Sequence, residues 1–361
     1  MPTLNSEQRI KNLLRLVAQQ NASDLHLVVG RYPTVRLDGK LYPLTQEAVL
    51  SAEDTKMLSD GLMTEENKKR LIADGQVDFS YNFEEKARFR TNVFYQKGNV
   101  SVAMRLVSGR IRTLEELNLP PALYEFTHKM QGLLLVTGPV GHGKSTTLSA
   151  LIDFINHNQD KHIITIEDPI EYIYEQDRCI INQREIGKDT KSFQDGLRSV
   201  FREDANVVLI GELRDLETIT TAMTAAETGH LILATIHTND TSQTIDRIID
   251  VFPAHQQNQI RSQLASVLLG VVSQRLLAKV GGGRIPALEI MINNHAVENL
   301  IRENKTYQID SVIETSLRDG MISLDKSLAD LVQRGLIVVD DALLYSSNRE
   351  YLQMLIGGRS E

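Results

Sequence analysis

Five short apolar runs, separated by stretches with helical periodicity, constrain the fold of this chain more than any other feature. The runs are LLLVT (133–137), IITIE (163–167), NVVLIGE (206–212), LILATIH (231–237) and ALEIMI (287–292). Strands that are apolar on both faces belong inside a parallel sheet, because crossover connections cover both faces with helices. This part of the chain is therefore predicted to be an α/β core with a parallel-rich sheet.

The first third of the chain has a different pattern, in which short helical stretches accompany strands with near-alternation of apolar and polar residues. Such alternation is typical of antiparallel strands with one buried face. The pair Asp38-Gly39 supplies the positive φ angles of a tight hairpin turn. The expected helices are 6–20, 52–60 and 64–73, and the expected strands are 25–29, 34–44, 77–83, 87–96 and 100–107.

Four regions follow from these patterns. Residues 1–107 are predicted to form a small α+β domain, and residues 108–120 a linker, because Gly109 and Pro120-Pro121 disfavour a continuous helix. Residues 121–293 would form the α/β core. Residues 294–361 are expected to be a succession of short helices.

The length and composition narrow the classes of protein that are possible. A chain of 361 residues favours two domains, and its 42% hydrophobic and 24% charged residues are typical of a globular protein. The net charge of −8 provides no general attraction to nucleic acid. The single cysteine, Cys179, excludes an internal disulfide and a Cys-based zinc site. No signal core or run of roughly 18 apolar residues is present, so we expect a cytoplasmic protein without a membrane-spanning segment.

A glycine-rich segment lies between the first apolar run and a helical pattern, and it matches Gly-x-x-x-x-Gly-Lys-Ser. Its glycines let backbone N–H groups turn inward around a phosphate, and the following helix directs its positive dipole end at the same point. A glycine-rich turn without function is the less favoured alternative, because a strand precedes the segment and a helix follows it. The predicted nucleotide-binding residues are Gly138, Pro139, Val140, Gly141, His142, Gly143, Lys144, Ser145 and Thr146.

Two acidic sites follow neighbouring apolar runs. Glu212 ends NVVLIGE, where it could orient or deprotonate the water that attacks a γ-phosphate. Glu167 and Asp168 end the preceding run, where carboxylates would surround a Mg²⁺ ion held by the hydroxyl of Ser145. The alternative for each is a solvated glutamate or turn at the end of a strand.

Two histidines bracket the run LILATI. His230 and His237 are seven residues apart, a separation that sends them to opposite faces of a regular strand and excludes a shared metal site. His237 is the better placed of the two to sense a γ-phosphate through a hydrogen bond. A structural role is the alternative for any single histidine.

Together these segments resemble the bacterial secretion ATPases, and in particular the PilT-like type IV pilus retraction ATPases. The resemblance rests on GPVGHGKSTT, ITIEDPIEY, VVLIGELRD and TGHLILATIHTND, and it extends from ASDLHL (22–27) to GMISLDKSL (320–328). It implies that ATP and Mg²⁺ are bound. It also implies a RecA-like core behind a PAS-like N-terminal domain.

The resemblance further assigns roles to individual residues. Glu212 would be the catalytic base, and Glu167 and Asp168 would assist at the metal and the water, with Ser145 and Glu167 binding Mg²⁺ partly through water. Arginines of the N-terminal domain would close on the phosphates. Among Arg88, Arg90 and Arg105, the resemblance favours Arg90 and Arg105, although arginines on a solvated strand face are the alternative.

A segment beyond the core resembles the family signature AIRNLIRE, which couples hydrolysis to retraction. The matching residues include Asn299, Leu300, Arg302 and Glu303, whereas Glu298 replaces the family's arginine.

The phosphate loop also departs from the usual GPTGSGKS at Val140 and His142, which are both variable positions.

The implied protein is a hexameric ring motor at the inner face of the cell membrane. It would act on an inner-membrane, PilC-like platform protein and power pilus retraction and twitching motility, without binding nucleic acid or zinc. Accessory PilU-like ATPases and pilus-assembly or type II secretion ATPases are the nearest alternatives, although the latter usually carry a tetracysteine zinc site. A RecA-like nucleic-acid motor is a different class, and no basic run interleaved with aromatic residues supports it.

Overall fold

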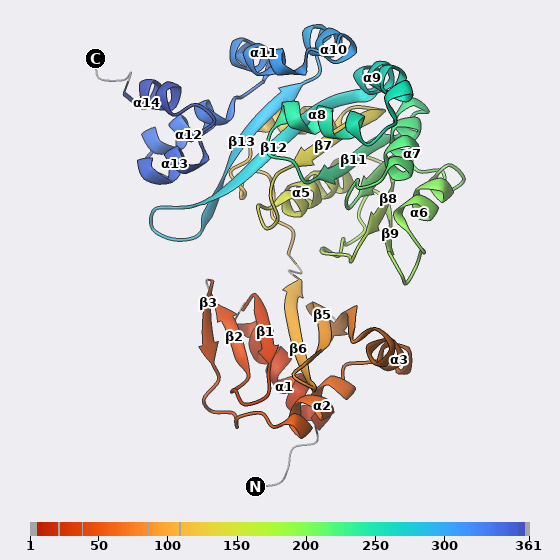
Figure 1. Ribbon diagram of the computed structural model, residues 1–361, viewed down its shortest axis with the longest axis vertical. Coiled ribbons are helices and arrows are strands. Elements are labelled where there is room, and N and C mark those ends of the chain that lie inside the picture. The colour runs from red at the N-terminus through yellow and green to blue at the C-terminus, as the bar shows by residue number, and fades with distance from the viewer. Residues whose placement is uncertain (1–5, 21, 38, 85–86, 108–109, 358–361) are drawn as a thin grey trace. The chain divides into compact units, whose positions relative to one another are not determined.

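The computed structural model describes residues 6–20, 22–37, 39–84, 87–107 and 110–357 (Figure 1). The chain divides into two compact units. The N-terminal unit comprises residues 1–110 together with Pro169–Ile173, and the core unit comprises the remainder. The limits at residues 107, 120 and 293 remain predictions.

The N-terminal unit is built on a six-stranded sheet in which every neighbouring pair is antiparallel, in the order β3-β2-β1-β6-β5-β4. The alternation in the sequence predicts this arrangement. Asp38 lies outside the described residues, but Gly39 has the positive φ of 81° that the hairpin requires. The strands are Asp24–Leu27 (β1), Thr34–Leu37 (β2), Lys40–Pro43 (β3), Gln76–Phe83 (β4), Ala87–Gln96 (β5) and Asn99–Val107 (β6).

One face of this sheet forms the hydrophobic core of the unit. Buried residues of the strands, such as Leu25, Phe89 and Met104, join apolar residues of the helices in a single cluster. The side chains of the intervening residues lie on the opposite face, because neighbours along a strand alternate. The helices are Ser6–Gln19 (α1), Ala52–Asp60 (α2) and Glu65–Asp74 (α3).

The core unit contains a seven-stranded sheet in the order β13-β12-β7-β11-β10-β8-β9. All neighbouring pairs are parallel except β12 and β13. The strands are Gly132–Thr137 (β7), His162–Glu167 (β8), Ile180–Glu185 (β9), Val207–Ile210 (β10), Leu231–Ile236 (β11), Leu268–Ala278 (β12) and Arg284–Ile292 (β13).

The observed sheet differs from the predicted one in three strands, β9, β12 and β13. The run 287–292 belongs to β13, which is an antiparallel edge strand and not a parallel core strand. Strands β9 and β12 were not predicted. Only the first two residues of β9 are apolar, and β12 continues directly from a helix and carries the polar stretch Ser273-Gln274-Arg275, so neither presents a clear apolar run.

Helices cover both faces of the core sheet (Figure 1). Ile164, Val208 and Ile232 pack in one cluster with helices on one side, whereas residues of alternate parity, such as Leu134 and Leu233, are equally buried on the other. The helices are η1 (Pro121–Leu123), α4 (Tyr124–Thr127), α5 (Lys144–Asn158), α6 (Phe193–Val200), α7 (Leu216–Glu227), α8 (Thr241–Asp250) and α9 (Ala254–Val267).

The C-terminal helices pack in two separate places. Helices α10 (His295–Arg302) and α11 (Ile309–Thr315) join the main core cluster, with η2 (Thr306–Gln308) between them. After η3 (Leu317–Asp319), helices α12 (Leu324–Gln333), α13 (Val339–Tyr345) and α14 (Arg349–Gly357) form a second cluster with Leu277, Ile285 and Ala287 of the β12–β13 hairpin. Among the described residues, no helix is both long and apolar enough to span a membrane.

Candidate functional site

The phosphate loop follows β7 and leads into α5. Gly138, Gly141 and Gly143 have φ angles of 139°, 80° and 84°. A Cβ atom at Gly138 would lie 2.4 Å from the carbonyl oxygen of Gln274, and one at Gly143 would lie 2.8 Å from Gln274 Nε2. Glycine is therefore required here by the neighbouring strand as well as by the backbone angles.

Gln274 of β12 forms hydrogen bonds with the loop and with the helix that follows it. Thr147 Oγ1 donates a hydrogen bond to Gln274 Oε1 at 2.7 Å, and Gln274 Nε2 donates one to the His142 carbonyl at 2.8 Å. The next contact along β12 is the Leu276 N–H, which donates to His142 Nδ1 at 3.0 Å. The loop is thus fixed to a strand that sequence analysis missed.

Lys144 is buried and directed into the loop. Its Nζ donates hydrogen bonds to the carbonyl oxygens of Gly138 at 2.8 Å and Pro139 at 3.0 Å, and lies 3.2 Å from His237 Nδ1. A lysine in this position brings a positive charge to the concave side of a phosphate-binding loop.

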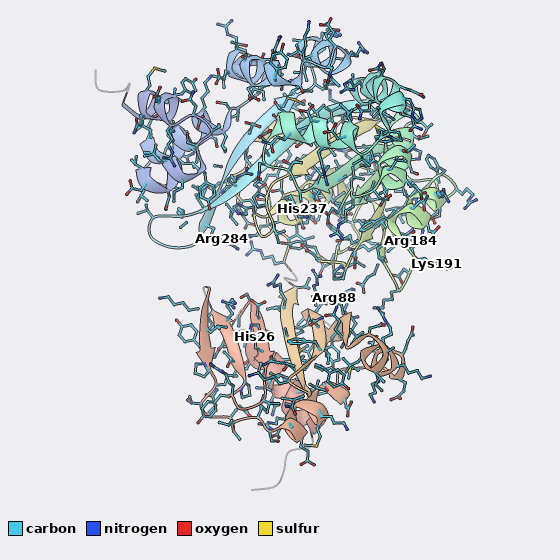
Figure 2. The ribbon with its side chains drawn as sticks, viewed as in Figure 1. His26, Arg88, Arg184, Lys191, His237 and Arg284 are labelled. Carbon is cyan, nitrogen blue, oxygen red and sulfur yellow. The ribbon has the colours of Figure 1, made fainter. Side chains whose placement is uncertain are left out.

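The catalytic candidates of the core meet at the carboxyl edge of the parallel strands. Strands β7, β11, β10 and β8 are consecutive neighbours, so the residues that follow them share one edge. His237 Nε2 lies 3.3 Å from Glu212 Oε1, and Arg214 Nη2 lies 2.6 Å from Glu212 Oε2. Lys144, His237, Glu212 and Arg214 therefore form a continuous polar line. Figure 2 shows the position of His237 in the core unit.

The charges along this line keep Glu212 ionised. Partial burial raises the pKa of Glu212, but the hydrogen bond from Arg214 and the nearby His237, Arg214 and Lys144 outweigh that effect, so the pKa lies below its usual value. The carboxylate is consequently deprotonated at neutral pH, as a general base must be.

Glu167 is the last residue of β8 and Asp168 follows it, next to the end of β10. The two strand ends are neighbours, because the Gly211 N–H donates a hydrogen bond to the Ile166 carbonyl at 2.8 Å. Glu167 is buried and accepts a hydrogen bond from Thr165 Oγ1 at 2.7 Å, whereas Asp168 is exposed. The hydrogen bond to Glu212 raises the pKa of Arg214, and the charge of Asp168 adds to that effect.

The donor set suits magnesium. Ser145 offers a hydroxyl oxygen at the start of α5, and Glu167 offers a carboxylate at the end of β8. Hydroxyl, carboxylate and water oxygens are the ligands that Mg²⁺ takes beside a nucleotide. His230, in contrast, lies before β11 with its ring Nδ1 3.0 Å from the Ala225 carbonyl, at the opposite end of the strand from His237.

Three residues of this site were missed by sequence analysis: Arg214, Gln274 and Tyr345. Arg214 lies two residues after Glu212 within VVLIGELRD, so its place at the edge could have been inferred. Tyr345 ends α13 and contacts His142 edge to face, with ring centroids 6.2 Å apart. Burial lowers the pKa of His142, and Arg275, Lys144 and Arg284 lower it further.

Arg90 and Arg105 belong to the N-terminal unit. They lie directly opposite each other on β5 and β6, and both are exposed. Arg105 Nε donates a hydrogen bond to Asp24 Oδ1 at 2.9 Å. Arg88 lies two residues before Arg90 on β5 and is less exposed.

The coupling candidates lie on and just after α10. Leu300 packs against the core cluster, whereas Asn299, Arg302 and Glu303 are exposed. Arg302 forms an ion pair with Glu298, the residue that departs from the family signature. Glu303 pairs with Lys305 at 2.7 Å.

Comparisons with known proteins agree with this geometry. The family described as type II/IV secretion system protein matches residues 5–282. The type IV pilus retraction ATPase PilT of Pseudomonas aeruginosa is 44% identical over 333 residues, covering 92% of this chain and 96% of that protein. A twitching motility protein of Neisseria gonorrhoeae is 42% identical over 342 residues, covering 94% of this chain and 91% of that protein.

A solved structure matches equally well. The crystal structure of the pilus retraction motor PilT with bound ADP has a TM-score of 0.89 and 45% identity to this chain, covering 95% of this chain and 98% of that one. With the nucleotide loop, the shared carboxyl edge and the near-complete coverage together, this chain belongs to the type II/IV secretion system protein family and is a PilT-like member of it.

Proposed function

We propose that this protein is a ring-forming ATPase that powers type IV pilus retraction. The observation that carries the proposal is the line from Lys144 through His237 to Glu212, which joins the phosphate loop to an ionised carboxylate at one edge of the sheet. Such a line is what hydrolysis of a γ-phosphate requires, since it combines a phosphate-binding cation with a base for water.

Each candidate residue of the core unit has its own role. The loop N–H groups and Lys144 bind the phosphates, Glu212 takes the proton of the attacking water, and His237 senses the γ-phosphate between them. Ser145 and Glu167 would hold Mg²⁺, Glu167 partly through water, with Asp168 assisting there. The metal, when bound, would neutralise charge on the phosphate oxygens.

The remaining tasks need a second domain and a second subunit. Arg90 and Arg105 would close on the phosphates and stabilise charge that develops in the transition state. A monomer has no neighbour to move, so domain closure produces work only in a ring, for which we propose a hexamer. The ring would act at the inner face of the cell membrane on a PilC-like platform protein, through Asn299, Leu300, Arg302 and Glu303.

Deletion of the gene in its host tests the function directly. We expect loss of pilus retraction and twitching, restoration by the wild-type gene, and no restoration by Lys144→Ala. One observation favours the accessory PilU-like function: Glu298 forms an ion pair with Arg302, so the side chain of a proposed coupling residue is already engaged. Retraction that persists in the deletion strain would favour that accessory function.

A further inference from the structure

A single row of residues crosses four strands of the N-terminal sheet. Arg36 on β2 pairs with Asp24 on β1, Asp24 pairs with Arg105 on β6, and Arg105 pairs with Arg90 on β5. Directly paired residues of antiparallel strands point to the same face. The row therefore places three guanidinium groups and one carboxylate on the face opposite the hydrophobic core.

Asp24 is the centre of this row. Its side chain is only 10% exposed, and it accepts a hydrogen bond from Arg105 Nε at 2.9 Å and one from Ser23 Oγ at 2.8 Å, with Arg36 Nε at 3.5 Å. The Arg105 side chain, in contrast, is 69% exposed. One end of Arg105 is thus held by a buried carboxylate while the rest of its side chain stays accessible.

The atoms used in this contact matter. Asp24 binds Nε, so the two Nη groups, which form the fork that recognises phosphate oxygens, are not consumed by Asp24. Like charges directly opposite each other on neighbouring strands repel, and Arg90 and Arg105 are such a pair. The carboxylate of Asp24 offsets this repulsion.

The charges of the row also reach His26, which lies two residues after Asp24 on β1 (Figure 2). Burial lowers the pKa of His26, and Arg36 and Arg105 lower it further, against the opposite effect of Asp24. Within the row itself, three guanidinium groups accompany one buried carboxylate, and this excess of positive charge suits a phosphate anion.

We infer that Asp24 is the positioning residue of Arg105: it fixes the guanidinium so that its Nη fork is presented to the phosphates of the nucleotide. This inference rests on the proposed function of Arg105. It adds a residue that acts through an arginine and does not itself touch the nucleotide.

The test is a double-mutant cycle on the full-length protein, with ATP hydrolysis and thermal melting measured for each variant. Asp24→Asn keeps the size of the side chain but removes its charge. We expect kcat to fall about tenfold, as misplacement of a catalytic group does, with little change in KM for ATP because the phosphate loop is intact. In the Arg105→Ala background, the same substitution should have no further effect on kcat.

Asp78→Asn is the matched control. Asp78 is exposed on β4 of the same sheet, and it lies outside the row, opposite Asn92. It should retain wild-type kcat. If Asp24→Asn does not melt cooperatively, Ser23→Ala is the second variant. It removes one hydrogen bond to the Asp24 carboxylate from an exposed position. We expect a smaller loss of kcat, which should also vanish in the Arg105→Ala background.

Three results would overturn the inference. If Asp24→Asn retains wild-type kcat, or if it lowers kcat by the same factor with and without Arg105, Asp24 supports only the fold. Wild-type turnover by Arg105→Ala itself would remove Arg105 from the proposed function, and the role of Asp24 with it. Failure of the inference and failure of the proposed function can be told apart. The first is measured on the Asp24→Asn variants, whereas the second is measured on Arg105→Ala, in which Asp24 is intact.

Discussion

The two sheets of this protein carry their functional groups in different places. The core sheet is parallel except at its β13 edge and is buried on both faces, so its polar groups gather where strands end, at Lys144, His237, Glu212 and Glu167. The N-terminal sheet is antiparallel with one buried face, so its charged groups lie across the other face, in the row through Asp24. The strand connections thus decide whether a sheet offers an edge or a face for binding.

The largest expected effect comes from the core edge. Lys144→Ala should lower turnover about a thousandfold or more, because the loop loses the cation that binds the phosphates. Phosphate release and thermal melting measure the outcome, with the exposed Lys188→Ala as control. Near-normal turnover in a folded variant would contradict the assignment of the loop.

Glu212→Gln should slow hydrolysis about a hundredfold while ATP binding is retained, because the substitution removes the base but keeps its shape. Trapped ATP after gel filtration would distinguish this from loss of binding. Glu217→Gln, on the exposed first turn of α7, should behave as wild type. A parallel loss of binding and turnover would make Glu212 structural and direct attention to Glu167 and Asp168.

The N-terminal face gives the next effect. Arg90→Ala and Arg105→Ala should each lower kcat about tenfold or more, with a smaller change in ATP affinity, since a guanidinium that arrives on closure acts mainly on the transition state. Arg88→Ala is the control on the same strand. Wild-type turnover in both variants would leave the face a solvated surface and confine catalysis to the core edge.

A smaller effect is expected from Arg214, the residue at one end of the polar line. Arg214→Gln removes the strongest group that lowers the pKa of Glu212, so this pKa should rise. A base with a lowered pKa keeps its activity as the pH falls, and the acid limb of the kcat profile should therefore move to higher pH in the variant. Arg202→Gln, exposed just after α6, should leave that limb in place. An unmoved limb in Arg214→Gln would show that Glu212 is not the titrating base.

The smallest effect on hydrolysis is expected outside both sheets. Arg302→Ala should retain at least half of the ATPase rate and the oligomeric state, yet lose pilus retraction in the host. The Arg302 side chain is exposed on α10, and a variant there leaves the packed residues Val297 and Ile301 intact. Glu298→Arg should be neutral or improve retraction, because it releases Arg302 and restores the family's arginine. Full retraction by Arg302→Ala would make α10 a packing helix only.

Local patterns predicted much of the fold and of the core site. The apolar runs indicated four of the parallel strands, and the residues that follow three of those strands carry the phosphate loop, Glu212 and His237. Helical spacing places Ala296 on the same face of α10 as the buried Val297 and Ile301, yet Ala296 is exposed. Helical periodicity assigns a residue to a face, but it does not say how far the packed stripe extends at a terminus.

The sequence by itself determined the phosphate loop, the acidic strand ends and the alternation that leaves one face of the N-terminal sheet polar, because each is a property of a few consecutive residues. Tertiary structure decided which distant residues complete these sites. Gln274 meets the carbonyl of His142 across 132 positions of the chain, and Asp24 holds Arg105 across 81. Both contacts depend on strand order and register, which are set by packing of the whole sheet and not by any local periodicity.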